Sequence, residues 1–234
     1  MAYSDTTLII PTINEKDTLP ILLRMVLDRY PGIRIIVVDD GSSDGTVREA
    51  MRFTKTGHVR ILDRKRLGRS PGLTASVVDG IMASKTEFVI IMDADMQHPP
   101  EKIGEIHKEL KGGYKVVVAV RETVIDWPLY RKVISRSLSG MGYVILLARG
   151  KKLTSDIFSG FFGVERRTAA KVILRDRARF VGEGYKILFD LLKCIDAKDG
   201  IEISEVKYSF GNREFGESKA GAKQAFALLK SYIT

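Results

Sequence analysis

Residues 88–95 read Phe88-Val89-Ile90-Ile91-Met92-Asp93-Ala94-Asp95, a short apolar run closed by two acidic residues. Apolar residues without polar alternation are typical of a strand that is buried on both faces. Similar runs recur along the first half of the chain, and longer segments of helical periodicity separate them. The predicted strands are Thr6–Pro11, Ile33–Asp39, Val59–Leu62, Phe88–Met92 and Lys115–Val120. This alternation predicts an α/β domain with a mostly parallel central sheet flanked by helices.

Helical periodicity fills the gaps between these strands. We expect helices at about Asp17–Arg29, Asp44–Lys55 and Pro71–Ala83. Ser70 is predicted to be the N-cap of the third helix, and Pro71 to preset its first turn.

Two further helical segments, at about 128–150 and 219–233, place basic side chains beside an apolar face. Each is compatible with packing in the core and with lying flat on an anionic membrane surface. No repeat, Pro-rich linker or low-complexity tract interrupts the chain. We therefore predict one domain over residues 1–218, which includes the helix at 128–150, followed by an amphipathic helix at 219–234.

Composition narrows the class of protein. The chain has 234 residues, of which 44% are hydrophobic, enough for one sizeable core. Its formal charge of +9 favours anionic partners such as nucleic acid, phosphorylated substrates or an acidic membrane surface. Cys194 is the single cysteine, so a disulfide framework is excluded, and no secretion signal is visible. The longest suggestive uncharged stretch, Ser137–Ala148, has 12 residues, short of the roughly 20 that a membrane-spanning helix needs.

Acidic residues follow two of the predicted strands. Asp39 and Asp40 end the second strand, and Asp93 and Asp95 follow the fourth. Because the ligand crevice of an open α/β sheet lies outside the carboxyl ends of its strands, both pairs are expected to converge on one site. Carboxylates beside a diphosphate indicate a divalent cation, Mg²⁺ or Mn²⁺. Aspartates after strands also serve as turn or cap residues, which is the preferred interpretation of Asp44.

Phosphate has to be held without a glycine-rich cradle. The sequence contains neither a Gly-x-x-x-x-Gly-Lys-Ser/Thr loop nor Gly-x-Gly-x-x-Gly. The candidates are the metal together with Arg121, at the end of the fifth strand, and Arg213 and Lys219 in a late loop. Taken alone, each of these residues is more often a solvated surface charge.

Six motifs in order carry a family resemblance over nearly the whole chain. Pro11-Thr12-Ile13-Asn14-Glu15, Val38-Asp39-Asp40-Gly41-Ser42 and the run from Met92 to Glu101 resemble the inverting glycosyltransferases of family 2, which have the GT-A nucleotide-diphospho-sugar transferase fold. Narrower features resemble the dolichol-phosphate mannose synthases within that family. These are Gln97-His98-Pro99-Pro100, Tyr130–Ser135, Ser159-Gly160-Phe161-Phe162, and Phe210-Gly211-x-Arg213 with Gly216-Glu217-Ser218-Lys219.

The resemblance implies roles for individual residues. The nucleotide pocket would contain Pro11, Ile13, Glu15, Val38 and Asp40. Asp93, Asp95 and Gln97 would hold Mg²⁺ or Mn²⁺, with Ala94 as a further donor contact, and Arg121, Arg213 and Lys219 would face the donor diphosphate and sugar. Arg131 and Ser135 would grip the acceptor phosphate. Asp95, Arg121 and Arg213 are the predicted catalytic residues. Two departures are Ile13, where the family usually has an aromatic residue, and Gly182-Glu183-Gly184, where it usually lacks an acid.

The implied reaction is hexosyl transfer with inversion, mannose from GDP-mannose, to dolichyl or polyprenyl phosphate. Such an enzyme is expected to lie peripherally on the cytoplasmic face of a membrane, with small membrane-anchoring subunits as possible partners, or in the cytoplasm if it is soluble. A lipid phosphate is already anionic, so no general base is needed. A sugar hydroxyl would require one, and Glu183 is the visible candidate, although a turn is the preferred interpretation. His98 is expected to shape its loop rather than bind metal.

Three alternatives stay open. A relative could use UDP-glucose or another donor with a polyprenyl phosphate or a soluble acceptor. A nucleic-acid-binding module is disfavoured because the chain has no aromatic-interleaved basic strands, recognition-helix pattern or zinc motif. A catalytically inactive relative is disfavoured because the predicted donor-binding residues are all present.

Overall fold

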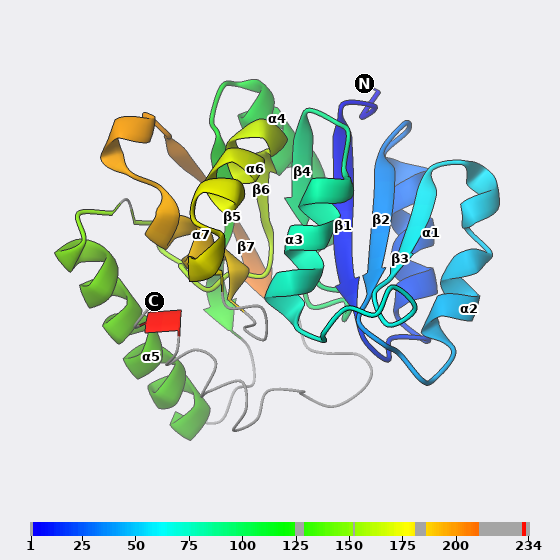
Figure 1. Cartoon of the computed structure of the whole chain (residues 1–234), viewed down its shortest axis with the longest axis horizontal. Coiled ribbons are helices and arrows are strands. Elements are labelled where there is room, and N and C mark those ends of the chain that lie inside the picture. Colours follow the sequence, from blue (N-terminus) through cyan, green and yellow to red (C-terminus); the bar gives the residue numbers. More distant parts are fainter. Residues whose placement is uncertain (1, 125–128, 152, 181–185, 211–230, 233–234) are drawn as a thin grey trace.

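A computed structural model describes residues 2–124, 129–151, 153–180, 186–210 and 231–232, without the side chains of 123–136, 197 and 210. Within these ranges the core is one seven-stranded sheet (Figure 1). Its strands are β1 Thr6–Thr12, β2 Arg34–Asp39, β3 Val59–Asp63, β4 Phe88–Ile91, β5 Val116–Val124, β6 Phe162–Glu165 and β7 Ile203–Phe210.

The sheet is mostly parallel, as predicted. The strand order is β3-β2-β1-β4-β6-β5-β7. β6 runs antiparallel to both of its neighbours, β4 and β5, and the other four pairings are parallel. Because the parallel strands end at one edge, the segments that follow β1, β2, β4 and β5 meet there, together with the segment that precedes β6.

Helices cover both faces of the sheet (Figure 1). One layer contains α1, α2 and α4, and the other contains α3, α6 and α7, with α5 packed outside α7. The helices are α1 Leu19–Arg29, α2 Thr46–Met51, α3 Leu73–Ala83, α4 Ile103–Lys111, α5 Leu129–Ala148, α6 Arg166–Arg175 and α7 Ile187–Cys194. Short 3-10 turns lie at Thr54–Thr56, Pro100–Lys102, Arg177–Arg179 and Ala197–Asp199.

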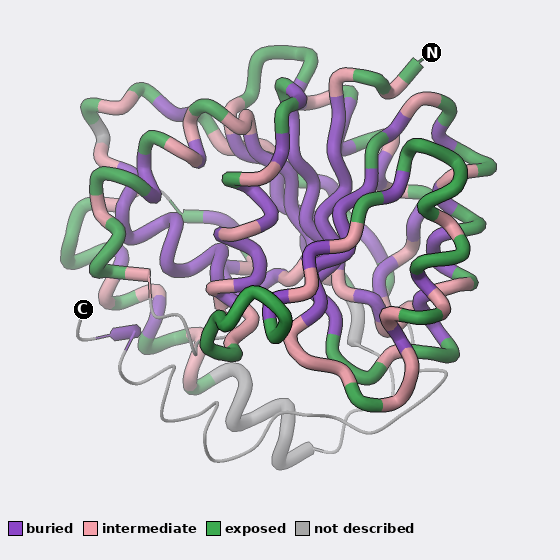
Figure 2. The backbone as a smooth tube through the Cα atoms, turned by 45° about the vertical axis from the view of Figure 1, so that its right-hand side comes forward, coloured by how far each residue is buried: buried purple, intermediate pink, exposed green. Residues whose placement is uncertain are grey.

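Successive side chains of a strand point to opposite faces of the sheet and belong to two hydrophobic clusters, one on each face. In β1, Leu8 and Ile10 face the α1–α4 layer, whereas Ile9 faces the α3–α7 layer. Both sets are fully buried, so the strand reads as continuously apolar. Figure 2 shows the strands as the buried interior between helices that are exposed on their outer sides. This explains why apolar runs located strands such as β1, β2 and β4.

The predicted elements match with a few shifts. All five predicted strands are present within a few residues of their expected bounds, but β6 and β7 were missed. The expected helix at Asp44–Lys55 is shorter, since α2 ends at Met51. The assignment of Ser70 and Pro71 to the start of the third helix is wrong. Gly72 occupies the N-cap position of α3 and accepts the first helical hydrogen bond, from the Ser76 N–H at 2.9 Å.

Helix α5 confirms the predicted helix at about 128–150. In its described half, Gly142 and Leu146 are buried, and a Cβ on Gly142 would lie 2.7 Å from Ile157 Cδ1. Val144 and Leu147 are exposed at 65% and 61%. One face of α5 therefore packs on the core while the opposite face presents apolar side chains outward. No helix in the described part of the chain is both long and apolar enough to cross a membrane.

The end of the chain is tied to the core by a buried ion pair. Lys193, fully buried on α7, donates to Asp190 at 3.0 Å and to the Ser231 carbonyl oxygen at 2.6 Å. Tyr232 stacks edge-on against Phe189 and donates to a carbonyl oxygen of α5. The expected helix at 219–233 and the boundary at 218 otherwise lie outside the described residues.

Candidate active site

The loops after β1 and β2 are bound to each other at the carboxyl edge of the sheet. The Asn14 N–H donates to Ser42 Oγ at 2.8 Å, and the Ser43 N–H donates to Asn14 Oδ1 at 2.9 Å. Asn14 has a φ of 51°, a left-handed conformation that asparagine tolerates better than most residues. These bonds fix the neighbours of Ile13, which is 38% exposed at this edge.

Asp39 and Asp40, the first acidic pair, have different roles. Asp39 is 1% exposed, and its carboxylate accepts hydrogen bonds from the N–H groups of Gly41 and Ser42 at 3.0 and 2.9 Å and from the Ser42 hydroxyl. It is therefore a turn residue. Asp44 is also a turn residue, as expected, since it accepts from the Thr46 N–H at 2.9 Å. Asp40, the other member of the pair, takes no part in this turn, and its side chain is 13% exposed.

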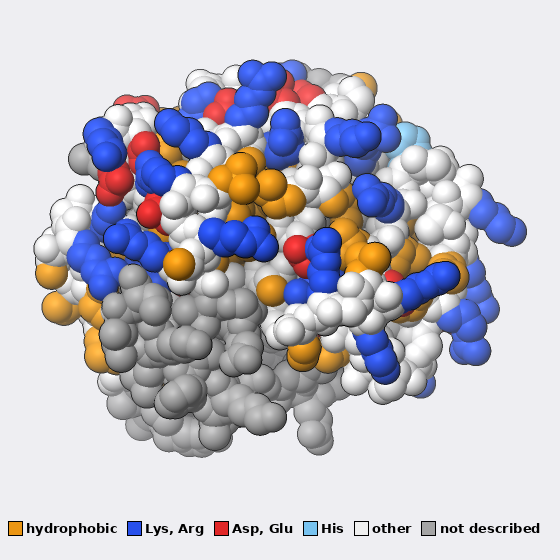
Figure 3. Space-filling view, in the orientation of Figure 1, with side chains coloured by type: hydrophobic (Ala, Val, Ile, Leu, Met, Phe, Trp, Pro, Cys, Tyr) orange, Lys and Arg blue, Asp and Glu red, His pale blue; other side chains and the backbone are white. Residues whose placement is uncertain are grey.

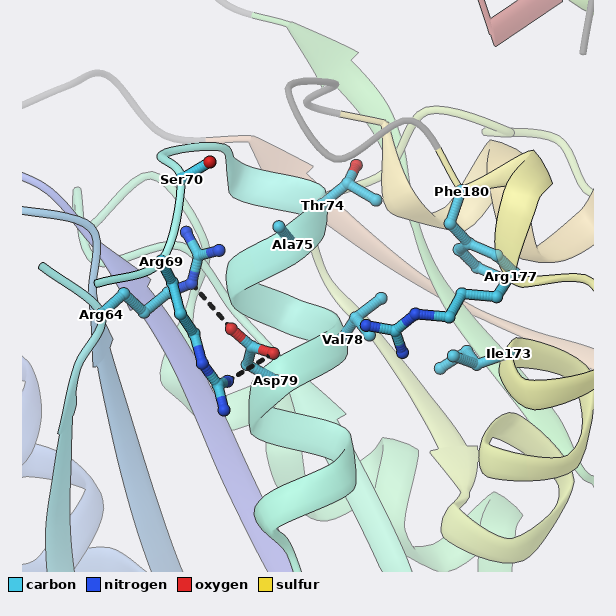
Figure 4. Close-up of a pocket in the computed structure, with 10 residues that line it drawn as sticks. All are labelled: Arg64, Arg69, Ser70, Thr74, Ala75, Val78, Asp79, Ile173, Arg177 and Phe180. Atoms are coloured by element: carbon cyan, nitrogen blue, oxygen red, sulfur yellow. Dashed lines mark hydrogen bonds and ion pairs between the residues drawn. The ribbon is translucent and has the colours of Figure 1, made fainter. Parts of the chain in front are cut away.

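Asp40 is joined to a network of arginines. Its carboxylate pairs with Arg64 and accepts from the Gly72 N–H at 2.7 Å. Arg64, which is 3% exposed, also donates to Asp79 at 2.8 Å, and Asp79 pairs with Arg69 at 2.6 Å. Figure 4 shows Arg64, Arg69 and Asp79 of this network, which line a cavity of about 400 Å³ between α3 and the end of α6. The network holds the loop between β3 and α3 against Asp40.

The remaining predicted nucleotide contacts lie around this edge. Pro11 is buried in β1, and Val38 is fully buried in the core, so Val38 could meet a ligand only through its backbone. Glu15 accepts from the Thr18 hydroxyl at 3.0 Å, and its own N–H donates to Thr46 Oγ1 at 2.8 Å. The structure brings these residues to one edge with Ile13 and Asp40.

The second acidic pair follows β4 at the same edge. Asp95 accepts from the Gln97 N–H at 3.2 Å, and Met96 between them has a φ of 61°. A left-handed conformation at a residue other than glycine costs about 1–3 kcal/mol and is typical of functional sites. Ala94 is buried, which fixes the backbone between the two acids.

Gly160 leaves room beside Asp93. A Cβ on Gly160 would lie 2.5 Å from Asp93 Oδ2, so any side chain there would displace the carboxylate. Asp93, Asp95 and Gln97 offer the oxygen ligands that Mg²⁺ and Mn²⁺ accept. In the described ranges no three His, Cys, Asp or Glu side chains gather to enclose a metal.

Arg121 lies near this pair, on the last part of β5. It binds Asp156 through both guanidinium arms, with Nε at 2.6 Å and Nη2 at 2.8 Å from the carboxylate oxygens. Burial alone would lower the pKa of Arg121, but its hydrogen bonds with Asp156 raise it above the ordinary value. The guanidinium is thus a fixed, permanent cation.

Lys186 and Asp156 were not anticipated from the sequence. Lys186 precedes α7, and its Nζ lies 3.3 Å from the Phe158 carbonyl oxygen and 5.3 Å from the Phe158 ring centroid. Burial, and then the charge of Arg121, lower the pKa of Lys186 to about 8, while Asp156 and Asp93 act in the opposite direction. Neither residue sits in a motif that distinguishes it from other surface charges.

Several predicted site residues cannot be placed. Arg213, Lys219 and Glu183 lie outside the described residues, and Arg131 and Ser135 lie on α5 with side chains that are not described. The described part of the site therefore consists of Asp40, Asp93, Asp95, Gln97 and Arg121 with their neighbours. A carboxylate pair and a fixed guanidinium at the carboxyl edge of a parallel sheet are typical of enzymes that act on nucleotide diphosphates.

Residues 7–174 match glycosyl transferase family 2. The chain belongs to this family. Among its relatives is a dolichol-phosphate mannosyltransferase of Mycosarcoma maydis, 36% identical over 208 residues. Proteins of the same name in Pyrococcus furiosus and Saccharomyces cerevisiae are each 32% identical, over 231 and 239 residues.

The coverage of these relatives is unequal. The alignments include 85%, 96% and 96% of this chain, but 65%, 61% and 84% of the relatives from Mycosarcoma, Pyrococcus and Saccharomyces. The chain thus spans less than two thirds of the length of the first two.

Solved structures support the GT-A fold. Glucosyl-3-phosphoglycerate synthase from Mycobacterium tuberculosis, in complex with Mn²⁺, UDP and phosphoglyceric acid, superposes with a TM-score of 0.66 at 18% identity, over 97% of this chain and 78% of that one. Mannosyl-3-phosphoglycerate synthase from Rubrobacter xylanophilus gives 0.62 at 16% identity, over 97% and 72%. At these identities the likeness establishes the fold alone.

Proposed function

We propose that this glycosyltransferase moves mannose from GDP-mannose, with inversion, to dolichyl or polyprenyl phosphate. The observation that carries the proposal is the Asp93–Asp95 pair, seated at the strand edge beside Gly160 and close to the fixed charge of Arg121. The names of the relatives support the choice of sugar and acceptor. The product is a lipid-linked sugar that serves glycosylation.

The chain's residues would position and neutralise the donor. Pro11, Ile13, Glu15, Val38 and Asp40 would contact the nucleoside, and Asp93, Ala94, Asp95 and Gln97 would lie at the diphosphate. Mg²⁺ or Mn²⁺ bound there would stabilise the charge that develops on the leaving diphosphate. Mn²⁺ is present in the solved complexes of structural neighbours.

Arg121 would face the reacting groups as a preorganised cation, because Asp156 already holds its orientation. Arg213 and Lys219 would add charge from the late loop. The acceptor phosphate oxygen attacks the anomeric carbon, and Arg131 and Ser135 would hold that phosphate. No general base is required, since the attacking oxygen carries a negative charge.

A lipid acceptor places the enzyme at a membrane surface. Figure 3 shows hydrophobic side chains at the edge of the molecule where the described half of α5 lies, with Lys and Arg side chains beside them. Met141, Val144 and Leu147 are exposed on this helix, and Arg149 follows it. We infer a peripheral position on the cytoplasmic face, with small anchoring subunits as partners.

A second candidate is transfer from UDP-glucose, to a polyprenyl phosphate or to a soluble acceptor. Ile13 keeps this candidate open, because the aliphatic side chain just after β1 offers the base an apolar contact in place of stacking, so it does not select guanine. A donor panel would separate the two. Purified protein is incubated with Mn²⁺ and labelled GDP-mannose or UDP-glucose, together with dolichyl phosphate or a simple sugar.

The proposal expects label from GDP-mannose in the organic phase. It also expects Asp95→Ala to abolish transfer while the circular dichroism spectrum stays that of a folded protein. Label that enters the organic phase from UDP-glucose alone, or only a soluble product, would replace mannosyl transfer by the second candidate. Full activity of the Asp95 variant would show that the cation site is misplaced.

A further inference from the structure

A buried chain of polar side chains leads from β7 to Asp93. Tyr208 is 3% exposed on β7, and its hydroxyl lies 2.7 Å from His98 Nδ1. His98 is 4% exposed, and its Nε2 lies 3.5 Å from Asp93 Oδ2. The imidazole thus stands between a phenol and a carboxylate that is itself 35% exposed at the sheet edge.

The surroundings leave the imidazole little freedom. Its ring centroid lies 5.4 Å from that of Phe161 and 5.7 Å from that of Tyr208. A Cβ on Gly160 would lie 3.4 Å from His98 Nε2, so the glycine admits both the ring and the carboxylate. The β5–β7 register places Tyr208 beside Arg121, which fixes the phenol relative to the rest of the site.

The direction of the two contacts follows from charge. Burial, together with Asp156, Asp93 and Asp95, raises the pKa of Tyr208 above its ordinary value, so the phenol keeps its proton. Because the phenol donates to Nδ1, the ring hydrogen lies on Nε2, the nitrogen that faces the carboxylate.

We propose that Tyr208 and His98 are positioning residues that hold the Asp93 carboxylate in the orientation required for the divalent cation. The inference rests on the proposed function only in taking Asp93 as a cation ligand. Hydrogen-bonding partners behind a ligand commonly set its orientation, and their loss typically weakens metal affinity by 10–100-fold. Neither residue touches substrate.

The first test is Tyr208→Phe, which removes one oxygen atom. Mn²⁺ affinity is measured by electron paramagnetic resonance in the presence of GDP, and GDP affinity without metal is measured by calorimetry. We expect Mn²⁺ affinity to fall by about tenfold or more, with metal-free GDP affinity unchanged. Tyr232→Phe is the matched control, since Tyr232 is also buried and donates one hydrogen bond, at 2.6 Å, to the Leu138 carbonyl oxygen on α5.

Two substitutions at His98 distinguish the roles of its two ring nitrogens. In His98→Gln the amide nitrogen takes the place of Nε2 and retains a donor for Asp93, whereas in His98→Asn the amide reaches only toward Tyr208. The glutamine variant should therefore bind Mn²⁺ more tightly than the asparagine variant. Packing alone would also favour the larger glutamine, so the GDP affinity without metal is measured for both variants. A difference confined to Mn²⁺ affinity supports the positioning role, and a parallel difference in GDP affinity indicates packing.

Nitrogen-15 NMR of the imidazoles gives a readout that is independent of metal. His58, His98 and His107 are the three histidines of the chain, and variants at each assign the signals. We expect the Nε2–H tautomer for His98 in the wild type and its loss in Tyr208→Phe. Observation of the Nδ1–H tautomer, or wild-type Mn²⁺ affinity in Tyr208→Phe, would overturn the proposal.

These outcomes are distinct from a failure of the proposed function. If Asp95→Ala abolishes Mn²⁺ binding and Tyr208→Phe does not change it, the cation site is supported and the positioning role of Tyr208 and His98 is refuted. If the wild type binds no Mn²⁺ in the presence of GDP, the cation site of the proposed function is refuted, and the positioning role is refuted together with it.

Discussion

Gly160 shows how a residue without a side chain can define a site. Its Cα hydrogen faces Asp93, and any larger group would occupy the position of the carboxylate. The sequence predicted the acids at 93 and 95 because they follow a recognisable apolar strand. It did not predict Asp156, Lys186 or Tyr208, because their importance depends on neighbours 35 to 110 positions away in the chain, such as the Arg121–Asp156 and His98–Tyr208 pairs.

The Asp156→Ala variant should lose more in the rate of glycosyl transfer than in affinity for the nucleotide. The variant removes the bidentate partner of the Arg121 guanidinium, which is 19% exposed, and so loosens the orientation that the proposed donor contact requires. We expect kcat/KM to fall by about tenfold or more and the free energy of unfolding to fall by about 3 kcal/mol. Steady-state kinetics and urea denaturation measure the two quantities.

Asp199→Ala is the matched control for Asp156. Asp199 also meets an arginine with both oxygens, Arg175 at 3.1 and 3.2 Å, but it precedes β7 and so lies at the opposite edge of the sheet. This variant should keep wild-type kcat/KM. Equal kinetic losses in both variants would mean that ion pairs anywhere in the domain matter, and that Arg121 has no particular role.

Lys186 should give stability a distinctive pH dependence. Its pKa in the folded protein is about 8, below the ordinary value of 10.5. Between these values the unfolded chain holds a proton that the folded chain has released, so this residue makes stability rise with pH across that window. Urea denaturation at about pH 7, 8.5 and 10 should show this rise for the wild type relative to Lys186→Met. Parallel pH profiles would contradict the lowered pKa.

At the scale of elements, whether a strand could be predicted depended on the order of apolar and polar residues along it. β1, β2 and β4 are buried on both faces and read as unbroken apolar runs. β7 is an edge strand whose sequence Ile203-Ser204-Glu205-Val206-Lys207-Tyr208 alternates with polar residues, and β6 has only four residues. Short or half-exposed strands carry a weaker signal, since polar alternation also occurs in loops.

Helix α5 provides a test of membrane contact. Leu147→Glu places a charge on its exposed apolar face, and we expect binding to vesicles that contain anionic lipid to weaken by about tenfold. Leu174→Glu on α6 is the matched control for Leu147→Glu, because both leucines are 61% exposed. Cosedimentation measures the binding, and thermal melting verifies that both variants are folded. Equal binding by the two variants would remove α5 from the proposed membrane surface.

At the scale of the whole molecule, a buried ion pair on α7 binds the segment at Ser231, which is far away in the sequence. Lys193→Met would leave the Asp190 carboxylate, 1% exposed, without its cation. We expect a loss of about 3–5 kcal/mol in the free energy of unfolding, measured by the urea midpoint. The double variant Asp190→Leu with Lys193→Met should recover much of this loss, since the uncompensated charge is gone. No recovery would indicate that packing, and not charge, is responsible.

The ladder between β4 and the antiparallel strand β6 divides the sheet into two parts. Every strand before residue 112 lies on one side of the β4–β6 ladder, and β5, β6 and β7 lie on the other. The two parts are therefore consecutive in sequence, and they meet along the β4–β6 ladder, with α4 packed across it and α3 packed on α6 and α7. Asp93 and Asp95 belong to the first part and Arg121 to the second, so the proposed donor site is assembled across this seam. A chimera that crosses over at Gly112–Gly113 would exchange one part between relatives, and its activity would report whether the two sides of the site are compatible.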